Sequence, residues 1–491
     1  MRSTTRARRR FPFLALALLG APACDAPPPR GAGDVVPDSA GIATAPTLDS
    51  LGRLDSALLV AADSPAAAPI VAGAAIGPED LTVRFEPADP ALRVPRPAHV
   101  RALYVNAYSA GSAQRMNALI GLADRTEINA FVIDIKEADG QVTYRSSIPL
   151  VRRIGANQVS PIGNVRALLA RLREHGIYPI ARIVVFKDPT LATARPDWAI
   201  QTADGRLWRD QHGVAWVDSY NRNVWEYNLA LAREAVALGF SEIQWDYVRF
   251  PDVPATYMRT AVHPARAGRT RPAAIREFLR WSREQLGPLG VQVTADVFGV
   301  TTSSSGDVGI GQHWESMADV TDVLLPMVYP SHYPRGSFGI RHPNAAPYHT
   351  VLTAMRHAVR RSGRIQNAAT VRPWLQDFTL GQPIYRAAHV RAQIQAVYDA
   401  GLTEWVLWNA SSRYTAGALA DADGNVPPIE GLDELLAPLP DWSPEPDPAA
   451  ADSAAQAAPD SGRVDSIQAP ADPDTVVEDA AVPLGEARDS T

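Results

Sequence analysis

Residues 225–251 read WEYNLALAREAVALGFSEIQWDYVRFP and contain one complete step of the fold, a helix followed by a strand. Apolar residues at Leu229, Ala232 and Val236 recur at the three- and four-residue spacing of one helix face. A glycine follows this pattern, and glycine is the residue that most often ends a helix. The run from Glu242 to Tyr247 is short and largely apolar, so it predicts a buried strand.

The same alternation recurs between about Val100 and Pro440. Short apolar or β-branched runs are separated by longer stretches with helical spacing. The predicted strands are Leu103–Ala107, Phe131–Ile135, Tyr178–Val185, Glu242–Tyr247, Val291–Val297, Val323–Val328, Ile365–Thr370 and Glu404–Trp408.

Strands that alternate with helices pair in parallel, because each crossover uses the intervening helix. Eight such units in about 340 residues predict an α/β fold of the closed (β/α)8 type, a TIM barrel. The alternative is an open doubly wound sheet, whose first strand usually leads into a glycine-rich phosphate turn. The first predicted strand leads instead into Tyr104-Val-Asn-Ala-Tyr-Ser109, which contains no glycine, so the barrel is favoured.

Barrel enzymes place their chemistry at the carboxyl ends of the strands, so the last residues of each strand are candidate site residues. Here these positions carry carboxylates on three strands, accompanied by aromatic, basic and amide side chains. The candidate substrate-binding residues are Asp134, Lys136, Arg182, Tyr247, Arg249, Tyr329, Trp374, Trp408 and Asn409, and the candidate catalytic residues are Asp246 and Asp296.

Aromatic rings and carboxylates around one mouth suit a carbohydrate, whose ring faces are apolar and whose edges carry hydroxyl groups. Cleavage of a glycosidic bond needs two carboxyl groups, one to protonate the leaving oxygen and one to attack or to activate water. Asp246 and Asp296 follow neighbouring strands and form the candidate pair. Arg249 or Lys136 would keep one of them ionised, while drier surroundings would raise the pKa of the other.

These residues also have structural interpretations. An aspartate late in a barrel strand often accepts hydrogen bonds from the next loop, and for Asp134 this role stands beside ligand positioning. Isolated tryptophans are more often core residues than sugar platforms. His332 is the only histidine at a strand end, and neither His-x-His nor His-Glu-x-x-His occurs, so we expect no metal and no other cofactor.

The formal net charge of −6 is concentrated in residues 441–491, which contain twelve acidic and two basic residues. The remainder is close to neutral, unlike a nucleic-acid-binding domain, so we exclude nucleic acid as a partner. The Ala-, Pro-, Asp- and Ser-rich composition of the same segment predicts a disordered acidic tail. The single cysteine excludes an intramolecular disulfide and a multi-thiolate zinc site.

The first 23 residues have the pattern of a secretory signal peptide, because arginines precede an apolar run too short to span a bilayer. Cys24 follows small residues, as in a bacterial lipobox, although Ala21 stands where leucine is usual. We therefore expect a lipid anchor on Cys24 and a location in the cell envelope, facing the periplasm or the exterior. Ordinary cleavage, with secretion of the protein, is the alternative.

Residues 24–97 are rich in alanine and proline and predict a tether, with a small strand pair around Leu81–Phe85. The barrel domain is expected over residues 98–440, between this tether and the acidic tail.

Several stretches together resemble the bacterial glycosyl hydrolase domain family, a family with a TIM barrel and an activity inferred from its fold. They are Phe131–Gly140, Trp225–Ala235, Glu242–Pro251, Thr294–Thr302, Gly309–Gln312, Leu325–Tyr333, Arg372–Phe378 and Trp405–Ala410. The resemblance covers the core from about Val100 to Tyr414.

This resemblance implies a barrel distantly similar to α-amylase and α-galactosidase enzymes, in which the aspartate after strand four is the nucleophile. That role falls on Asp246. The acid stays open: the amylase-like position after strand five holds Asp296, whereas the α-galactosidase-like position after strand six holds Tyr329 and His332.

We therefore expect a retaining glycoside hydrolase that acts on a polysaccharide or exopolysaccharide outside the cytoplasm, with Asp246 as nucleophile and Asp296 as acid/base. A non-catalytic glycan-binding envelope lipoprotein is the alternative, because the sequence offers no unambiguous acid. A transglycosidase would use the same residues.

Overall fold

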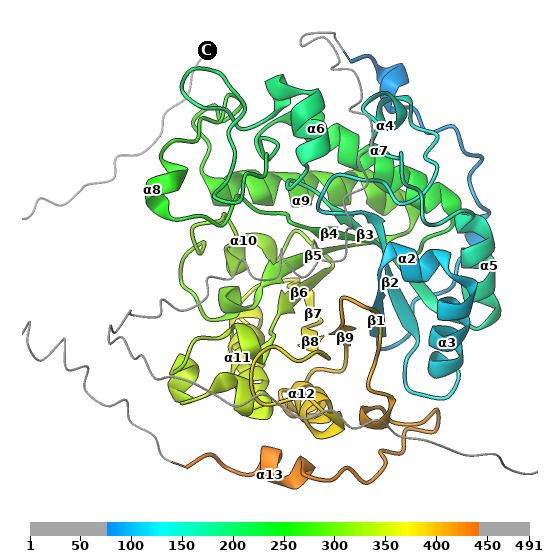
Figure 1. The fold of residues 1–491 in the computed structure, drawn as a ribbon, viewed down its shortest axis with the longest axis vertical. Helices are drawn as coiled ribbons and strands as arrows, with labels where there is room; N and C mark the ends of the chain where they lie inside the picture. Colours follow the sequence, from blue (N-terminus) through cyan, green and yellow to red (C-terminus); the bar gives the residue numbers. More distant parts are fainter. Residues whose placement is uncertain (1–75, 441–491) are drawn as a thin grey trace, which may run out of the picture. The chain divides into compact units, whose positions relative to one another are not determined.

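The structure, a computed structural model, describes residues 76–440 (Figure 1). The predicted signal peptide, Cys24 and the acidic tail lie outside the described residues. No helix within residues 76–440 has the length and apolar character needed to cross a membrane.

Parallel strands form a closed barrel at the centre of the described chain. The order of hydrogen-bonded neighbours is β5-β4-β3-β2-β1-β9-β8-β6, and β6 pairs with β5 to close the ring. The strands are β1 (Arg101–Val105), β2 (Ala130–Lys136), β3 (Tyr178–Val184), β4 (Glu242–Asp246), β5 (Gln292–Phe298), β6 (Val323–Met327), β7 (Thr370–Val371), β8 (Trp374–Gln376) and β9 (Trp405–Trp408). The predicted TIM barrel is confirmed.

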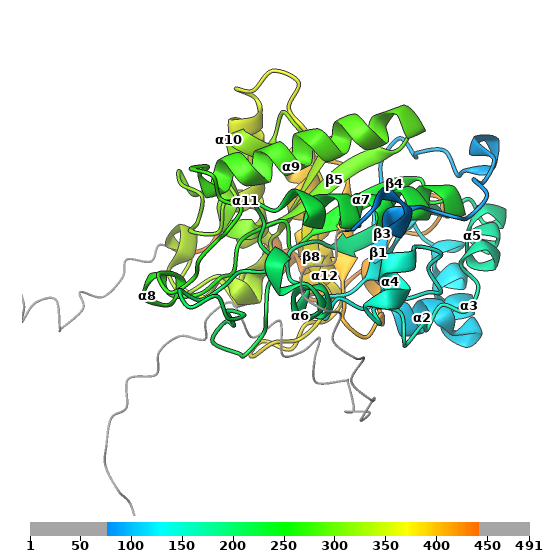
Figure 2. The same cartoon turned by 90° about the horizontal axis from the view of Figure 1, so that it is seen from above.

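Helices surround the strands, with α3 and α5 beside β1 and β2, and α11 and α12 beside β8 and β9 (Figures 1 and 2). The helices are α2 (Ala107–Gly111), α3 (Ala113–Ala123), α4 (Pro149–Arg153), α5 (Val165–Glu174), α6 (Pro189–Ala194), α7 (Arg222–Leu238), α8 (Ala255–Met258), α9 (Arg271–Leu286), α10 (Trp314–Met317), α11 (Pro347–Ser362), α12 (Ala387–Asp399) and α13 (Leu432–Leu436). Gly239 ends α7 with a φ of 118°, as the sequence predicts.

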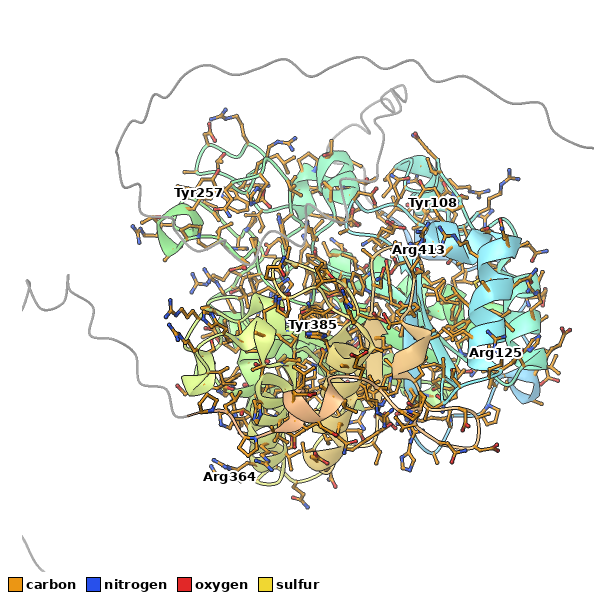
Figure 3. The ribbon with its side chains drawn as sticks, turned by 60° about the horizontal axis from the view of Figure 1, so that its bottom comes forward. Tyr108, Arg125, Tyr257, Arg364, Tyr385 and Arg413 are labelled. Carbon is orange, nitrogen blue, oxygen red and sulfur yellow. The ribbon has the colours of Figure 1, made fainter. Side chains whose placement is uncertain are left out.

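Alternating residues of each strand separate two apolar clusters. Phe131 and Ile133 of β2 point outward and pack with the helices, whereas Val132 points into the barrel with Ile180 and Leu325. Figure 3 shows the side chains of the described residues, with Arg125, after α3, and Tyr257 of α8 at opposite edges of the view. The barrel is therefore packed and rigid, which fixes the positions of side chains at its mouth.

The seventh strand differs from the prediction. Ile365–Thr370 is wrong for most of its length, because the backbone N–H of Ile365 still bonds to Ser362 at the end of α11 and Asn367 has a φ of 55°. The strand runs instead as β7 and β8, interrupted at Pro373, which has no N–H to donate. Trp374 therefore lies within the strand.

Residues 76–97, predicted as the end of the tether, contact the barrel. Val94 is buried, and the guanidinium of Arg93 donates to the carbonyl of Leu289 at 2.6 Å. The predicted strand pair near Leu81–Phe85 is wrong. A 3-10 helix, η1 (Pro78–Leu81), ends at Leu81, and residues 82–85 form no strand. Proline suits the first helical position, and Asp80 accepts the N–H of Gly77.

Candidate active site

One half of the barrel interior is polar. The inward-facing side chains of β6, β9 and β1 are largely apolar, whereas β3, β4 and β5 contribute Arg182, Gln244, Asp246 and Asp296. Side chains along a strand point alternately to its two faces, so residues two apart share a face. Gln244 and Asp246 of β4 therefore both point into the barrel. A cluster of charges therefore forms on the barrel axis near the carboxyl ends of the strands.

Arg182 joins three carboxyl groups from three other strands. Its Nη1 is ion-paired with Asp134, and its Nη2 and Nε lie 2.5 and 2.9 Å from Oδ2 of Asp246. Nε also lies 4.0 Å from Oδ2 of Asp296. A planar guanidinium can serve several carboxylates at once, so Arg182 holds Asp246 and Asp296 close together. We call Asp134, Arg182, Asp246 and Asp296 the mouth cluster.

The environment of Asp296 favours its protonated form. Burial raises the pKa of the Asp296 carboxyl well above its usual range, and the neighbouring charge of Asp246 raises it further. Gln244 Nε2 donates to both carboxyl oxygens at 2.9 and 3.0 Å, and Trp374 Nε1 donates to Oδ1 at 2.7 Å. Both oxygens of Asp296 therefore accept hydrogen bonds from neutral side chains.

Asp246 has a different environment from Asp296. Its Oδ2 accepts from Arg182, and its Oδ1 accepts the backbone N–H of Tyr247 at 2.5 Å. It is also the most exposed carboxylate of the cluster, at 6%, against 1% for Asp134 and Asp296. A ligand that enters from the mouth therefore meets Asp246 first.

Asp134 is held by an aromatic pair as well as by Arg182. The hydroxyl of Tyr104 donates to Asp134, and the Tyr104 ring packs on Trp408 with 4.0 Å between centroids. Burial raises the pKa of Asp134, and Arg182 opposes that rise. These contacts support the positioning role of Asp134 over a role in direct attack.

Three of the predicted sugar platforms, Tyr329, Trp374 and Trp408, are buried instead of forming an open surface. Trp374 is 1% exposed, and its ring packs edge-on against Trp408 at 5.5 Å. Tyr329 is 3% exposed and packs against Phe378 and His332. In this structure Trp374 orients a carboxyl group, because its indole N–H reaches Asp296 across the barrel.

Lys136 does not lie with the mouth cluster, contrary to the prediction. A β-bulge between Asp134 and Lys136 adds a residue to β2, so the two side chains point to opposite faces. Lys136 is fully buried, 2.7 Å from Asp188, and donates to the carbonyl of Val184 and to Asn228 of α7. Arg182, and not Lys136 or Arg249, is the basic side chain that pairs with Asp246.

Asn409 also differs from the expectation. Its amide donates to the carbonyl of Asp377 at 2.6 Å, and its oxygen accepts from the N–H and the hydroxyl of Ser411. Because both ends of the amide are used within the turn after β9, Asn409 stabilises that loop.

Tyr247 and Arg249 lie at the rim, after β4. Tyr247 has a φ of 48°, a left-handed conformation that is rare for a residue with a bulky side chain. The guanidinium of Arg249 lies 4.8 Å from the centre of the Tyr247 ring. These two predicted binding residues therefore form a unit beside Asp246.

Two site residues were not found from the sequence. Gln244 supports Asp296, and Tyr104 supports Asp134. A signal for Gln244 existed, since it stands two positions before Asp246 in an apolar strand and so shares its face. Tyr104 has no comparable signal, because neither residue two positions away from it is a candidate site residue.

Metal binding has no candidate in the described residues. Within residues 76–440, no group of three or more His, Cys, Asp or Glu side chains is arranged to hold a metal ion.

Residues 102–414 match the family described as "Putative glycosyl hydrolase domain". No curated protein matches the sequence. Among solved structures, a hypothetical protein from Ruminiclostridium thermocellum shares 42% identity over 40% of this chain and 97% of that chain, with a TM-score of 0.37.

Two further solved structures are similar at low identity. The glycoside hydrolase domain of PgaB (BpsB) from Bordetella bronchiseptica shares 14% identity over 64% of this chain and 95% of that chain, with a TM-score of 0.46. The α-galactosidase TtGalA from Thermus thermophilus shares 16% identity over 65% and 60%, with a TM-score of 0.40. Because all three TM-scores are below 0.5, the site assignment depends on the geometry and on the family.

Proposed function

The chain belongs to the "Putative glycosyl hydrolase domain" family, and we propose that it is a retaining glycoside hydrolase with Asp246 as nucleophile and Asp296 as acid/base. The observation that carries this proposal is the pair of contrasting carboxyl environments around Arg182. Asp246 is ion-paired and nearer the mouth, as a nucleophile should be. Asp296 has a raised pKa, as a proton donor should have.

The geometry around Arg182 supports retention of anomeric configuration. One nitrogen, Nε, lies 2.9 Å from Asp246 Oδ2 and 4.0 Å from Asp296 Oδ2. The sum of these distances is the largest separation possible for the two oxygens. This upper limit is above the ~5–5.5 Å separation of the carboxyl groups in retaining enzymes. It excludes most of the ~6.5–9.5 Å range of inverting enzymes.

In the proposed reaction, Asp296 protonates the glycosidic oxygen while Asp246 attacks the anomeric carbon and forms a covalent glycosyl intermediate. Asp296, now ionised, then takes a proton from water, which attacks the same carbon and releases Asp246. Arg182 keeps both carboxyl groups in place through its contacts with Asp246 and Asp296.

The substrate that we propose is a polysaccharide or exopolysaccharide outside the cytoplasm, reached by a chain anchored in the cell envelope through Cys24. The support is the sequence pattern around Cys24. Globomycin, which blocks processing of lipidated precursors, should make the precursor accumulate, and Cys24→Ser should release the protein from the membrane fraction. A membrane-bound Cys24→Ser protein would contradict the anchor.

The experiment for catalysis uses the full chain on a panel of polysaccharides and aryl glycosides. Asp246→Asn and Asp296→Asn should each lower turnover by roughly 10²–10⁴-fold, since each removes a covalent or proton-transfer step. Asp204→Asn, the same change on an exposed turn, is the matched control. Proton NMR of the first-formed anomer then tests retention. Equal turnover in wild type and Asp246→Asn on every cleaved glycan would refute the assignment, and glycan binding without turnover would favour the non-catalytic alternative.

A further inference from the structure

Two basic side chains at the rim of the barrel have no acidic partner among the described residues. Lys187 follows β3 and Arg249 follows β4, so both lie on the side of the mouth next to Asp246. Neither forms an ion pair with a carboxylate in residues 76–440. The nearby carboxylates of the mouth cluster pair with Arg182 instead, and none of them forms an ion pair with Lys187 or Arg249.

Arg249 is held by aromatic faces. Its guanidinium carbon lies 5.2, 4.8 and 4.7 Å from the ring centres of Trp216, Tyr247 and Phe298. Within residues 76–440, its side chain donates one hydrogen bond, from Nη1 to the carbonyl of Phe250. Stacking fixes the plane of a guanidinium but leaves the N–H groups at its edge free, so Arg249 is oriented and still able to bind an acceptor.

Trp216 is itself fixed in place. Its indole N–H donates to Asp210 at 2.9 Å, and Asp210 also accepts the backbone N–H groups of His212 and Val214. The loop between β3 and α7 therefore brings a rigid ring against Arg249. These contacts restrict both Trp216 and Arg249, and a surface arginine without a binding role would not need such ordering.

Tyr247 links the two basic residues to the candidate nucleophile. The ammonium of Lys187 lies 5.1 Å from the Tyr247 ring centre, close to the distance of the Arg249 guanidinium from the same ring. The backbone N–H of Tyr247 bonds to Asp246. Two like charges near one ring repel each other, and an anion between them would relieve that repulsion.

We propose that Lys187 and Arg249 bind an anionic substituent of the glycan, a carboxylate or a phosphate ester, on the sugar next to Asp246. The inference depends on the proposed function, because it assigns the substrate class of the same site. Arg249 would make a two-pronged contact with two oxygens of the anion, and Lys187 would supply a single charge. A neutral polysaccharide would leave both charges uncompensated.

The test uses the full chain on an array of oligosaccharides in matched pairs, each neutral sugar beside its uronate and its phosphate ester. Binding is measured for wild type, Lys187→Gln, Arg249→Gln and the control Arg206→Gln, whose side chain is exposed and paired with Asp204. We expect wild type to retain anionic members at least about tenfold better than their neutral partners, with the preference weakened by salt. Whether the uronates or the phosphate esters are retained shows which of the two anions the site binds.

Lys187→Gln should reduce the anionic signal by about tenfold, and Arg249→Gln by at least as much, while Arg206→Gln binds like wild type. Arg249 is well packed, so Arg249→Gln risks misfolding; Lys187→Gln, at a partly exposed position, keeps the test decisive. Equal binding of neutral and anionic members, failure to retain any anionic member, or wild-type preference in Lys187→Gln would overturn the proposal.

Chemical modification gives an independent readout. The sequence contains two lysines, and Lys136 is fully buried, so Lys187 is the lysine that an amine-acetylating reagent can reach. Glucuronate and inorganic phosphate should each slow acetylation of Lys187, measured by mass spectrometry, whereas glucose should not. Protection by glucose equal to that by both anions would contradict an anion site.

These measurements are separable from catalysis. Array binding and acetylation require no turnover, so an inactive protein that still prefers anions would refute the hydrolase and not the anion site. An active hydrolase that binds neutral and anionic glycans equally would refute the anion site and not the hydrolase.

Discussion

Two clusters of charged side chains lie inside the same barrel, and they differ in the number of carboxyl groups for each arginine. Below the mouth cluster, Arg372 contacts Glu242 at 2.6 Å and Glu404 at 2.9 Å, and Arg96 contacts Glu404 as well. This floor cluster therefore matches two carboxylates with two arginines. The mouth cluster has three carboxyl groups for Arg182 alone.

The imbalance has a chemical consequence. Buried carboxylates in excess of their positive partners cannot all remain ionised, so some must hold protons. The pKa of Asp134 and that of Asp296 are both raised, mainly by burial. The floor cluster, with as many arginines as carboxylates, stabilises the fold. The mouth cluster, with more carboxyl groups than arginines, keeps a proton on one carboxyl group beside another, which is what acid-assisted displacement requires.

The largest effect on stability should come from Arg372→Met. This change leaves Glu242 buried without its arginine, and breaking a buried pair in this way costs about 3–5 kcal/mol. Urea unfolding followed by tryptophan fluorescence measures the loss. Arg206→Met, at an exposed position, should change stability by less than about 0.5 kcal/mol. A similar small loss in Arg372→Met would contradict a structural role for the floor cluster.

Arg182→Met should cost less, about 1–3 kcal/mol, because the carboxyl groups around it can take up protons when the positive charge is removed. The loss should be smaller at pH 5 than at pH 8, since protonation is easier at pH 5. Turnover should nevertheless be abolished. If Arg182→Met and Arg372→Met lose the same stability at both pH values, the two clusters do not differ as described.

The raised pKa of Asp296 predicts how stability depends on pH. Above the usual aspartate pKa of about 3.9, the folded chain keeps a proton that the unfolded chain has released. The contribution of Asp296 to stability is therefore full below about pH 4 and is lost as the pH rises through its raised pKa. Asp296→Asn should lack this loss and gain stability over wild type as pH increases. A difference in unfolding free energy between the two proteins that stays constant from pH 4 to pH 9 would contradict this prediction.

The smallest expected effect concerns Trp374→Phe, which removes the N–H donor to Asp296. The loss of one hydrogen bond should lower stability by about 1 kcal/mol. Because that bond lowers the pKa of Asp296, its removal should also move the alkaline limb of the activity profile to higher pH. Trp408→Phe, a comparable change in the adjoining ring, should leave the limb in place. A shift in Trp408→Phe alone would place the proton donor elsewhere.

Most of the barrel could be predicted from local pattern. Seven of the eight predicted strands agree with the structure to within a few residues. The exception is Ile365–Thr370, which follows the end of α11 and in which only Ala369 is buried, whereas the strand lies mostly after it, across Pro373. The strand itself buries Val371, Trp374 and Leu375.

The site could be predicted less completely. Strand alternation correctly groups Asp246 with the barrel interior, but it also predicts that Lys136 shares the face of Asp134. The bulge in β2 reverses that face, and a bulge leaves little trace in sequence. The rings of Trp374 and Trp408 were expected to face a sugar, whereas contacts across the barrel turn them toward carboxyl groups and one another.

The sequence by itself determined the order of strands and helices, the closure that this order favours, and the acidic residues at the strand ends, because periodicity and composition are local properties. Tertiary structure alone decided that Arg182 serves Asp134, Asp246 and Asp296 together and that Lys136 faces the helices. The physical reason is that burial and charge balance depend on which strands become neighbours. A carboxylate acquires its protonation state from partners that lie tens of residues away in the chain.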